Sequence, residues 1–109
     1  MWALTEKDYA PLKPFQSVTL SIAPGEQMNF TIQPETTRYY DIRTFGISDT
    51  VMVLFEDDNG NPRYLTADDD SGDDTNASLR VKLLKDHKYI LRIRLCYSDC
   101  SGETAVMMW

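Results

Sequence analysis

Hydrophobic and polar residues alternate along the chain in several short segments. In SVTLSI (17–22), Val18, Leu20 and Ile22 alternate with hydroxyl side chains. Because successive side chains of a strand point to opposite faces, this period of two predicts a strand with one buried face. The same alternation in MNFTI (28–32), LRVKLL (79–84) and KYILRIRLCY (88–97) predicts three further strands.

Four other segments predict strands by composition and context. The segments 39–45 and 103–109 are rich in aromatic, β-branched and other apolar residues. VMVLFE (51–56) is apolar at every position but the last, which indicates a central strand. Asn59-Gly60 follows it as a strong hairpin signal, so we expect a short strand over 63–66 to answer it across the turn.

Eight strands separated by turn residues, with no helical periodicity, predict an all-β fold. We expect an antiparallel β-sandwich, jelly-roll-like. The 109 residues suit one domain over 1–109, with 1–16 as a lead-in and 17–109 as the sandwich. A hydrophobic content of 42% and a charged content of 26% are typical of a folded globular domain.

Targeting signals are not evident in the sequence. No run of 18 apolar residues is present, so we expect no membrane-spanning helix. MWALTEKDYA (1–10) carries charges where a secretory signal needs its apolar run, so an export signal is expected outside this segment. We therefore interpret the chain as a domain excised from a longer protein.

The net charge of −6 is concentrated in one region. Eight acidic residues and one basic residue, Arg63, lie between Glu56 and Asp74, whereas the rest of the chain is close to neutral. A nucleic-acid-binding domain needs clustered basic residues to contact phosphates. No basic stripe is visible in the sequence, so we expect no nucleic-acid partner.

The two cysteines, Cys96 and Cys100, lie four positions apart. We interpret them as a short-loop disulfide, which would place the protein in an oxidising compartment. Two reduced thiols are the alternative. A zinc site is not expected, because it needs about four ligands and the chain has one histidine.

Nothing in the sequence forms a catalytic motif. His87 is the only histidine, and it lies between Asp86 and Lys88 in an expected turn. A nucleophile, a base and an orienting group are needed for nucleophilic catalysis, and no nucleophile motif accompanies His87. We expect a structural turn histidine and no enzyme activity.

The segment DDDSGDDTN (68–76) crowds five aspartates into seven positions. Calcium binds six to eight oxygen ligands, and carboxylates held this close repel one another unless a cation neutralises them. The spacing differs from an EF-hand loop. A solvated loop, in which the aspartates cap turns and protect a sheet edge, is the alternative interpretation. The candidate calcium ligands are Asp68, Asp70, Asp73 and Asp74, with Asp49 and Asp57 as further members.

Exposed aromatic residues are the candidates for ligand binding. Tyr39 and Tyr64 alternate with neighbours assigned to the core, so we expect both to face outward. Arg92 and Arg94 occupy the outward positions of their strand. A flat surface with these four residues would suit a polysaccharide or a protein fibre. Packing in the core or at a sheet edge is the alternative role for each tyrosine.

The order of these features resembles the bacterial pre-peptidase C-terminal (PPC) domain family. The matching segments are YDIRTFGISDTVMVLFEDDNGN, LTADDDSGDDTNASLRVKLLKDHKYILRIRLCY and SGETAVMMW. They supply an aspartate before an apolar strand, an asparagine-glycine hairpin, an aspartate-rich loop and a final strand led by glycine. Asp86-His87 departs from the family, which usually has a small residue or glycine there, and the cysteine pair is not a family feature.

The resemblance implies a β-sandwich domain appended to secreted proteases and other exported hydrolases, related to the collagen-binding domains of secreted bacterial collagenases. We expect a non-catalytic, secreted accessory domain, stabilised by Ca²⁺, that attaches its parent protein to a carbohydrate or protein polymer. Its partners would be that polymer and the other domains of the parent. Two alternatives remain: a structural domain that aids secretion, folding or stability, and a protein-interaction module.

Overall fold

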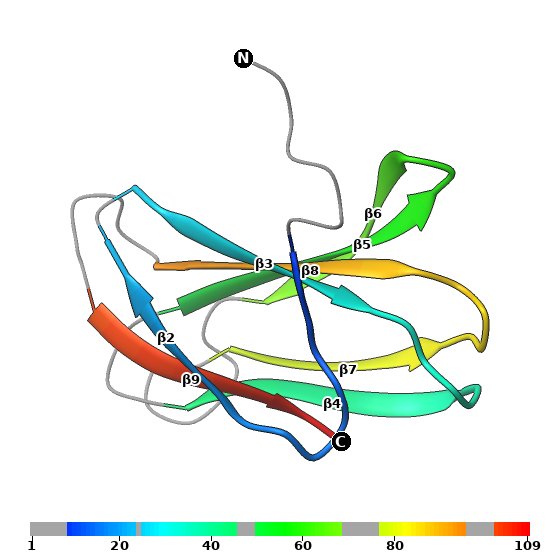
Figure 1. Cartoon of the computed structure of the whole chain (residues 1–109), viewed down its shortest axis with the longest axis horizontal. Coiled ribbons are helices and arrows are strands. Elements are labelled where there is room, and N and C mark those ends of the chain that lie inside the picture. The colour runs from blue at the N-terminus through cyan, green and yellow to red at the C-terminus, as the bar shows by residue number, and fades with distance from the viewer. Residues whose placement is uncertain (1–8, 24, 46–49, 69–76, 96–101) are drawn as a thin grey trace.

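The computed structural model describes residues 9–23, 25–45, 50–68, 77–95 and 102–109. Across these ranges the chain forms nine strands and no helix (Figure 1). No helix in the described part is long and apolar enough to cross a membrane. The strands are β1 (Ala10–Pro11), β2 (Val18–Ile22), β3 (Gln27–Ile32), β4 (Arg38–Phe45), β5 (Thr50–Asp58), β6 (Asn61–Asp68), β7 (Ser78–Leu83), β8 (Tyr89–Leu95) and β9 (Gly102–Met108).

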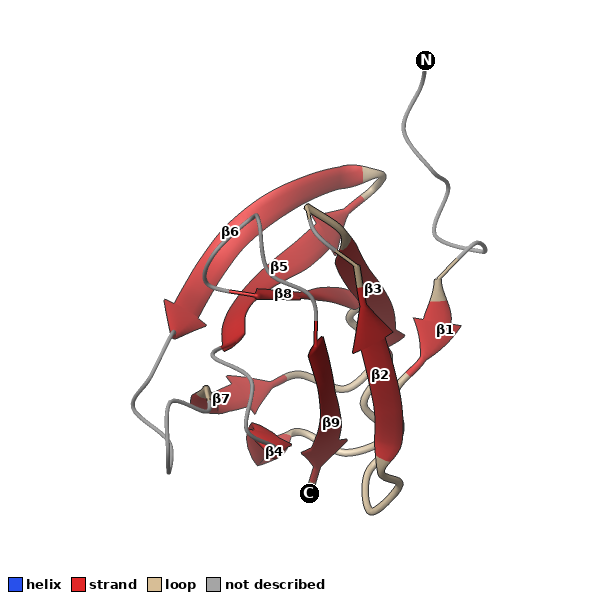
Figure 2. Ribbon diagram, turned by 90° about the vertical axis from the view of Figure 1, so that its left-hand side faces the viewer, coloured by secondary structure: helices blue, strands red, loops and turns tan. Residues whose placement is uncertain are grey.

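The strands form two sheets that pack face to face (Figure 2). One sheet has five strands in the order β1-β3-β8-β5-β6, and the other has four in the order β2-β9-β4-β7. All pairings are antiparallel except that of β1 with β3. The predicted all-β antiparallel sandwich is therefore confirmed.

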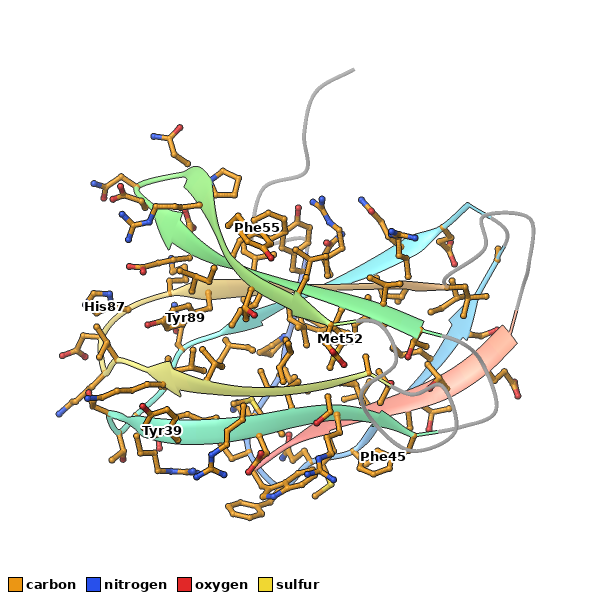
Figure 3. The ribbon with its side chains drawn as sticks, turned by 180° about the vertical axis from the view of Figure 1, so that it is seen from behind. Tyr39, Phe45, Met52, Phe55, His87 and Tyr89 are labelled. Atoms are coloured by element: carbon orange, nitrogen blue, oxygen red, sulfur yellow. The ribbon has the colours of Figure 1, made fainter. Side chains whose placement is uncertain are left out.

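The core lies between the sheets and follows the period-two pattern of the sequence. In β8, Tyr89, Leu91, Ile93 and Leu95 are buried, whereas the residues between them are not. Met52 and Leu54 of β5, the next strand of the same sheet, pair with Ile93 and Leu91 and are fully buried as well. Figure 3 shows Met52 between the two layers. Burial of this single face per strand supplies the hydrophobic stabilisation of the fold.

The sandwich extends further toward the N-terminus than the sequence pattern indicates. We expected residues 1–16 to be a lead-in, but Ala10–Pro11 forms a short strand beside β3. Leu12 is buried in the core, and its N–H donates to the carbonyl oxygen of Thr31. The Phe15 N–H donates to the carbonyl oxygen of Met108 in the other sheet. Two residues are too few to show an alternating pattern, which is why this strand was not predicted.

A buried hydrogen-bond pair connects the two sheets at one end of the sandwich. Thr44 of β4 and Thr50 of β5 are almost fully buried, and their hydroxyl oxygens lie 2.6 Å apart. The Ala77 N–H donates to the Thr44 hydroxyl at 2.9 Å. Because an unpaired polar group in the core costs free energy, these mutual bonds allow two threonines to occupy core positions.

The β5–β6 hairpin confirms the turn predicted from Asn59-Gly60. Both residues have positive φ angles, 53° at Asn59 and 88° at Gly60, as a two-residue type I′ hairpin requires. The Gly60 N–H also donates to Oδ1 of Asp57 at 2.7 Å. The turn thus fixes the register of β6, at one edge of the five-stranded sheet, as far as Tyr64; an irregularity between Leu54 and Phe55 shifts the pairing beyond it.

Replacing Gly60 by alanine should destabilise the fold through backbone strain alone. An added Cβ at Gly60 would meet no atom within 4 Å, so steric clash does not contribute. We expect the free energy of unfolding to fall by about 1–2 kcal/mol, because a left-handed conformation disfavours residues with a Cβ. Urea unfolding of Gly60→Ala measures this, with Asn59→Gly as the control that should cost nothing. An unchanged midpoint for Gly60→Ala would contradict the role given to the turn.

Candidate binding surface on the five-stranded sheet

Three of the four predicted ligand-binding residues share the outer face of the five-stranded sheet. Tyr64 of β6 pairs with Phe55 of β5, and Arg92 and Arg94 of β8 pair with Val53 and Val51. Figure 3 shows Phe55 on the side of this sheet that faces away from the core. Because paired residues in a sheet point to the same face, Tyr64 and the two arginines lie on that side as well.

A continuous series of side-chain contacts crosses this face from β3 to β6. Arg92 Nε donates to Asn29 Oδ1 at 3.1 Å. The Arg92 guanidinium lies over the Phe55 ring, 5.2 Å from its centroid. The Phe55 and Tyr64 rings meet edge to face with centroids 6.5 Å apart. We call Asn29, Phe55, Tyr64 and Arg92 the five-strand patch.

Aliphatic residues surround this patch without being fully buried. Val51, Val53 and Ile90 occupy outward positions and are half-buried, while Met52 and Leu54 fill the inward positions of the same strand. The sequence led us to place β5 centrally because it is apolar on both faces. The structure confirms an interior place in the sheet, between β8 and β6, but the second apolar face belongs to the outer surface.

The arrangement suits a flat ligand or an extended chain. Tyr64 is 62% exposed, and Arg92 is held by its contacts with Asn29 and Phe55. Tyrosine and arginine are enriched among the residues that dominate binding energy, and side chains already held in place lose less entropy on binding. The patch crosses four adjacent strands, roughly 14 Å at the usual strand spacing.

Sequence reasoning missed two members of the patch, Asn29 and Phe55. Phe55 was placed in a central strand that is apolar on both faces, and Asn29 was part of a predicted strand without a binding role. An apolar outward position on an antiparallel sandwich, where polar residues are expected, was the signal that could have identified Phe55.

Tyr39 lies on the opposite side of the molecule from the five-strand patch. It occupies an outward position of β4 in the four-stranded sheet and is 56% exposed. Figure 3 shows Tyr39 and Phe45 beyond the lower sheet and Phe55 beyond the upper one. The four residues predicted as one ligand-binding set are therefore divided between two surfaces.

Two of the six candidate calcium ligands lie in described residues, and the structure separates them. Asp57 is next to the hairpin turn, whereas Asp68 pairs with Met52 at the other end of the same strands. Asp57 is five residues from Met52 along β5, which corresponds to roughly 17 Å at the usual rise per residue. Asp57 and Asp68 therefore do not share one metal site, and Asp57 instead accepts the Gly60 N–H in the hairpin.

Asp68 holds the base of the acidic loop. Its Oδ2 accepts the N–H of Ser78, ten positions along the chain, at 2.8 Å. A carboxylate has about four acceptor positions, so this bond is compatible with a second role as a metal ligand. No group of three or more His, Cys, Asp or Glu placed to hold a metal occurs among the residues that are described. Asp49, Asp70, Asp73, Asp74, Cys96 and Cys100 lie outside the described residues, so their predicted roles stay predictions.

His87 forms a polar cluster with Glu56 at the end of the sandwich near the hairpin. His87 Nδ1 lies 2.9 Å from Glu56 Oε2, and Arg63 donates to Glu56 Oε1 at 3.1 Å. The hydrogen bond from His87 lowers the pKa of Glu56, an effect that partial burial opposes and Arg63 reinforces. The His87 ring also stacks on Tyr89, whose pKa is raised by burial and whose hydroxyl accepts the Leu84 N–H. These contacts support the structural role expected for His87.

Comparison with known proteins identifies the architecture. No protein-family model and no curated protein matches the chain. The crystal structure of the pre-peptidase C-terminal domain of collagenase from Bacillus anthracis is similar, with a TM-score of 0.73 and 17% sequence identity, over 93% of this chain and 94% of that one. The chain has the fold of a pre-peptidase C-terminal domain. The resemblance inferred from the sequence is thus confirmed at the level of structure.

One departure from the PPC family has a structural explanation. Asp86 has a φ of 69°, in the left-handed region that glycine adopts most easily. Aspartate tolerates this conformation better than most residues that carry a Cβ. This conformation places His87 beside Glu56, where it forms the contact described above.

The contact between Glu56 and His87 predicts a pH-dependent contribution to stability. Because the pKa of Glu56 is lowered on folding, the contribution is present above the unfolded-state pKa and is lost as the pH falls through the folded-state pKa. At pH 7, Glu56→Gln should lower the free energy of unfolding by roughly 0.5–1 kcal/mol. The difference from wild type should shrink from about pH 5 downward. Urea titrations at several pH values measure it, with exposed Glu35→Gln as the control; a difference that persists unchanged at pH 3 would contradict the assignment.

Proposed function

We propose that the chain is a non-catalytic accessory domain that attaches an exported parent protein to a carbohydrate or protein polymer through the five-strand patch. The observation that carries this proposal is the contact series from Asn29 through Arg92 and Phe55 to Tyr64. It leaves an aromatic ring and a fixed guanidinium on an open sheet face, which an extended polymer can approach along its length.

The fold supports an accessory role. The similar domain of known structure is the pre-peptidase C-terminal domain of a collagenase. We therefore infer that the parent protein of this chain degrades a polymer. We infer an extracellular location and contacts with other domains of the parent on the same ground. Collagen fibrils are therefore among the first polymers to test, beside insoluble polysaccharides.

A structural domain that aids secretion, folding or stability of a secreted hydrolase is the rival function. It requires the sandwich core but no exposed recognition surface. The two functions make different demands on Tyr64, because its ring is largely outside the core. A substitution there leaves a purely structural role intact and impairs a binding role.

We also propose that Ca²⁺ stabilises the acidic loop. The donor set is suitable, since aspartate carboxylates are the oxygen ligands that calcium prefers. Asp68 anchors the loop at its first residue, and Asp70, Asp73 and Asp74 follow within six positions. Asp57 is no longer a candidate for this site, because the hairpin register separates it from Asp68. A bound cation would relieve the repulsion among these carboxylates and stabilise the folded state.

The polymer-binding role can be tested by co-sedimentation with collagen fibrils, cellulose and chitin. We expect wild type to bind at least one of them, and Tyr64→Ala and Arg92→Gln each to weaken that binding at least about tenfold, the effect of losing roughly 1.4 kcal/mol of binding free energy. Tyr39→Ala removes an equally exposed tyrosine from the opposite face and serves as the matched control. Circular dichroism confirms that each variant is folded.

Two results would contradict this proposal. Absence of binding to all three polymers would favour the structural domain. Equal losses in Tyr64→Ala and Tyr39→Ala would show that the five-strand patch is not the binding surface.

The calcium proposal predicts a thermal shift. At a calcium concentration 100 times the Kd, binding to the folded state adds about 2.7 kcal/mol to stability, so the thermal midpoint should rise clearly and fall again with a chelator. Asp70→Asn and Asp73→Asn together should abolish the response, and Asp57→Asn should retain it. If neither calcium nor the chelator changed the thermal midpoint, the calcium proposal would be wrong.

A further inference from the structure

The outer face of the four-stranded sheet carries a second group of exposed aromatic residues. Tyr39 and Phe45 occupy outward positions of β4 and are 56% and 45% exposed. Trp109 directly follows β9, and its backbone exchanges two hydrogen bonds of 2.9 Å with Asp41 of β4. The Phe45 and Trp109 rings stack with centroids 6.3 Å apart and an interplanar angle of 27°. Figure 3 shows Tyr39 and Phe45 on the same side of this sheet.

Cationic side chains lie among these rings. The Arg80 guanidinium is 5.6 Å from the centroid of the Tyr39 ring, and the Arg43 guanidinium is 5.5 Å from a ring of Trp109. Lys82 pairs with Tyr39 across β7 and β4 and is exposed. We call this set the four-strand patch; its members are Tyr39, Arg43, Phe45, Arg80, Lys82 and Trp109.

The patch is positive although the chain as a whole has a net charge of −6. Asp41 is the carboxylate within it, and Arg80 NH1 forms an ion pair with Asp41 Oδ2 at 3.1 Å. Arg43 and Lys82 add two charges that this pair does not balance. Glu103 is a second carboxylate on this face; it lies at the edge of the patch, opposite Ser21 of β2 and two residues beyond the row in which Ala105 pairs with Phe45. With both carboxylates counted against Arg43, Arg80 and Lys82, the face still has one net positive charge. Charge complementarity therefore selects an anionic partner for this face.

The geometry further favours an extended anionic chain with flat units. The six positions from Tyr39 to Phe45 correspond to roughly 20 Å along β4. Arg80 lies on the strand next to Arg43 and two residues along it, which puts their backbone positions about 8 Å apart. Lys82 lies two residues beyond Arg80 on the same strand. Aromatic rings alternate with these cations. Sugar rings can pack flat on aromatic faces while their carboxylate or sulfate groups bind the guanidinium and ammonium groups.

We propose that the four-strand patch binds an acidic polysaccharide, one that bears carboxylate or sulfate groups. Aromatic rings contribute stacking area for the sugar units, and Arg43, Arg80 and Lys82 bind the anionic groups. The site is separate from the five-strand patch, which lies on the opposite sheet, and it does not depend on the polymer proposed for that patch. Its ligand differs in chemistry, because three cations lie among the rings here, whereas amide and aliphatic side chains surround Arg92 there and Arg94 lies further along the same strand.

Binding to heparin and polygalacturonate tests the proposal, with dextran as the neutral comparison. Affinity electrophoresis and calorimetry at low salt should show binding to at least one of the two anionic probes, none to dextran, and a steep loss as the salt concentration rises. The triple variant Arg43→Gln, Arg80→Gln, Lys82→Gln should bind at least tenfold more weakly. A matched triple variant, Lys13→Gln, Arg63→Gln, Lys85→Gln, removes the same charge elsewhere and should retain most of the affinity.

The aromatic contribution needs its own variant. Trp109→Ala keeps every cation and removes one ring, so it should lower the affinity several-fold if sugars stack on the patch. In a Trp2→Phe background, saturating polygalacturonate should change the fluorescence of Trp109. Tyr64→Ala should bind the anionic probes as wild type does, which separates this result from the test of the five-strand patch.

Several outcomes would overturn the proposal. Lack of binding to both anionic probes would do so, as would equal losses in the two triple variants. An unchanged affinity in Trp109→Ala, together with duplex DNA binding as tightly as heparin, would reduce the patch to a general cation surface. Protein self-association detected by light scattering and abolished by the patch variant would instead assign the face to a second copy of the chain.

Discussion

The constraint on which the structure depends is that each strand can bury only one of its faces. The pleat sends successive side chains to opposite sides, and the two sheets share one core between them. Leu91 and Ile93 of β8 are fully buried, while Ile90 and Arg92, which alternate with them, remain on the outer face. Each inward residue thus fixes the orientation of its neighbours, and the core determines which side chains are presented to ligands.

This division allows the two outer faces to differ in chemistry while the core stays uniform. On the five-stranded sheet, valines and isoleucine surround Phe55, Tyr64 and one anchored arginine. On the four-stranded sheet, cations stand among the rings and the nearest carboxylate is paired. Since neither set reaches into the core, each can vary at small cost to folding. The fold of a PPC domain therefore fixes where a binding face can be, and the outward residues decide what it binds.

The strands and their buried residues could be predicted because period-two alternation is a local signal. Leu20 and Ile22 are buried as predicted, Val18 is partly buried, and Asn59-Gly60 forms the predicted turn. The candidate sites were harder, since they depend on which strands are neighbours. Sequence cannot show that Tyr39 and Tyr64 lie on opposite sheets, or that Asp57 and Asp68 lie at opposite ends of one hairpin. Both facts follow from strand order and register, which arise from long-range pairing.

Because a two-layer sandwich is thin, the two candidate binding faces lie close together although they are on opposite sides. Stacked sheets lie about 10 Å apart, so ligands on the two outer faces would be close in space without competing for the same atoms. A domain that holds one chain on each face gains effective concentration for the second contact once the first has formed. Weak individual contacts on open sheet faces can then produce durable attachment, with no cleft required. Such an arrangement would be most useful on a surface composed of mixed polymers, because the ligands proposed for the two faces differ in chemistry.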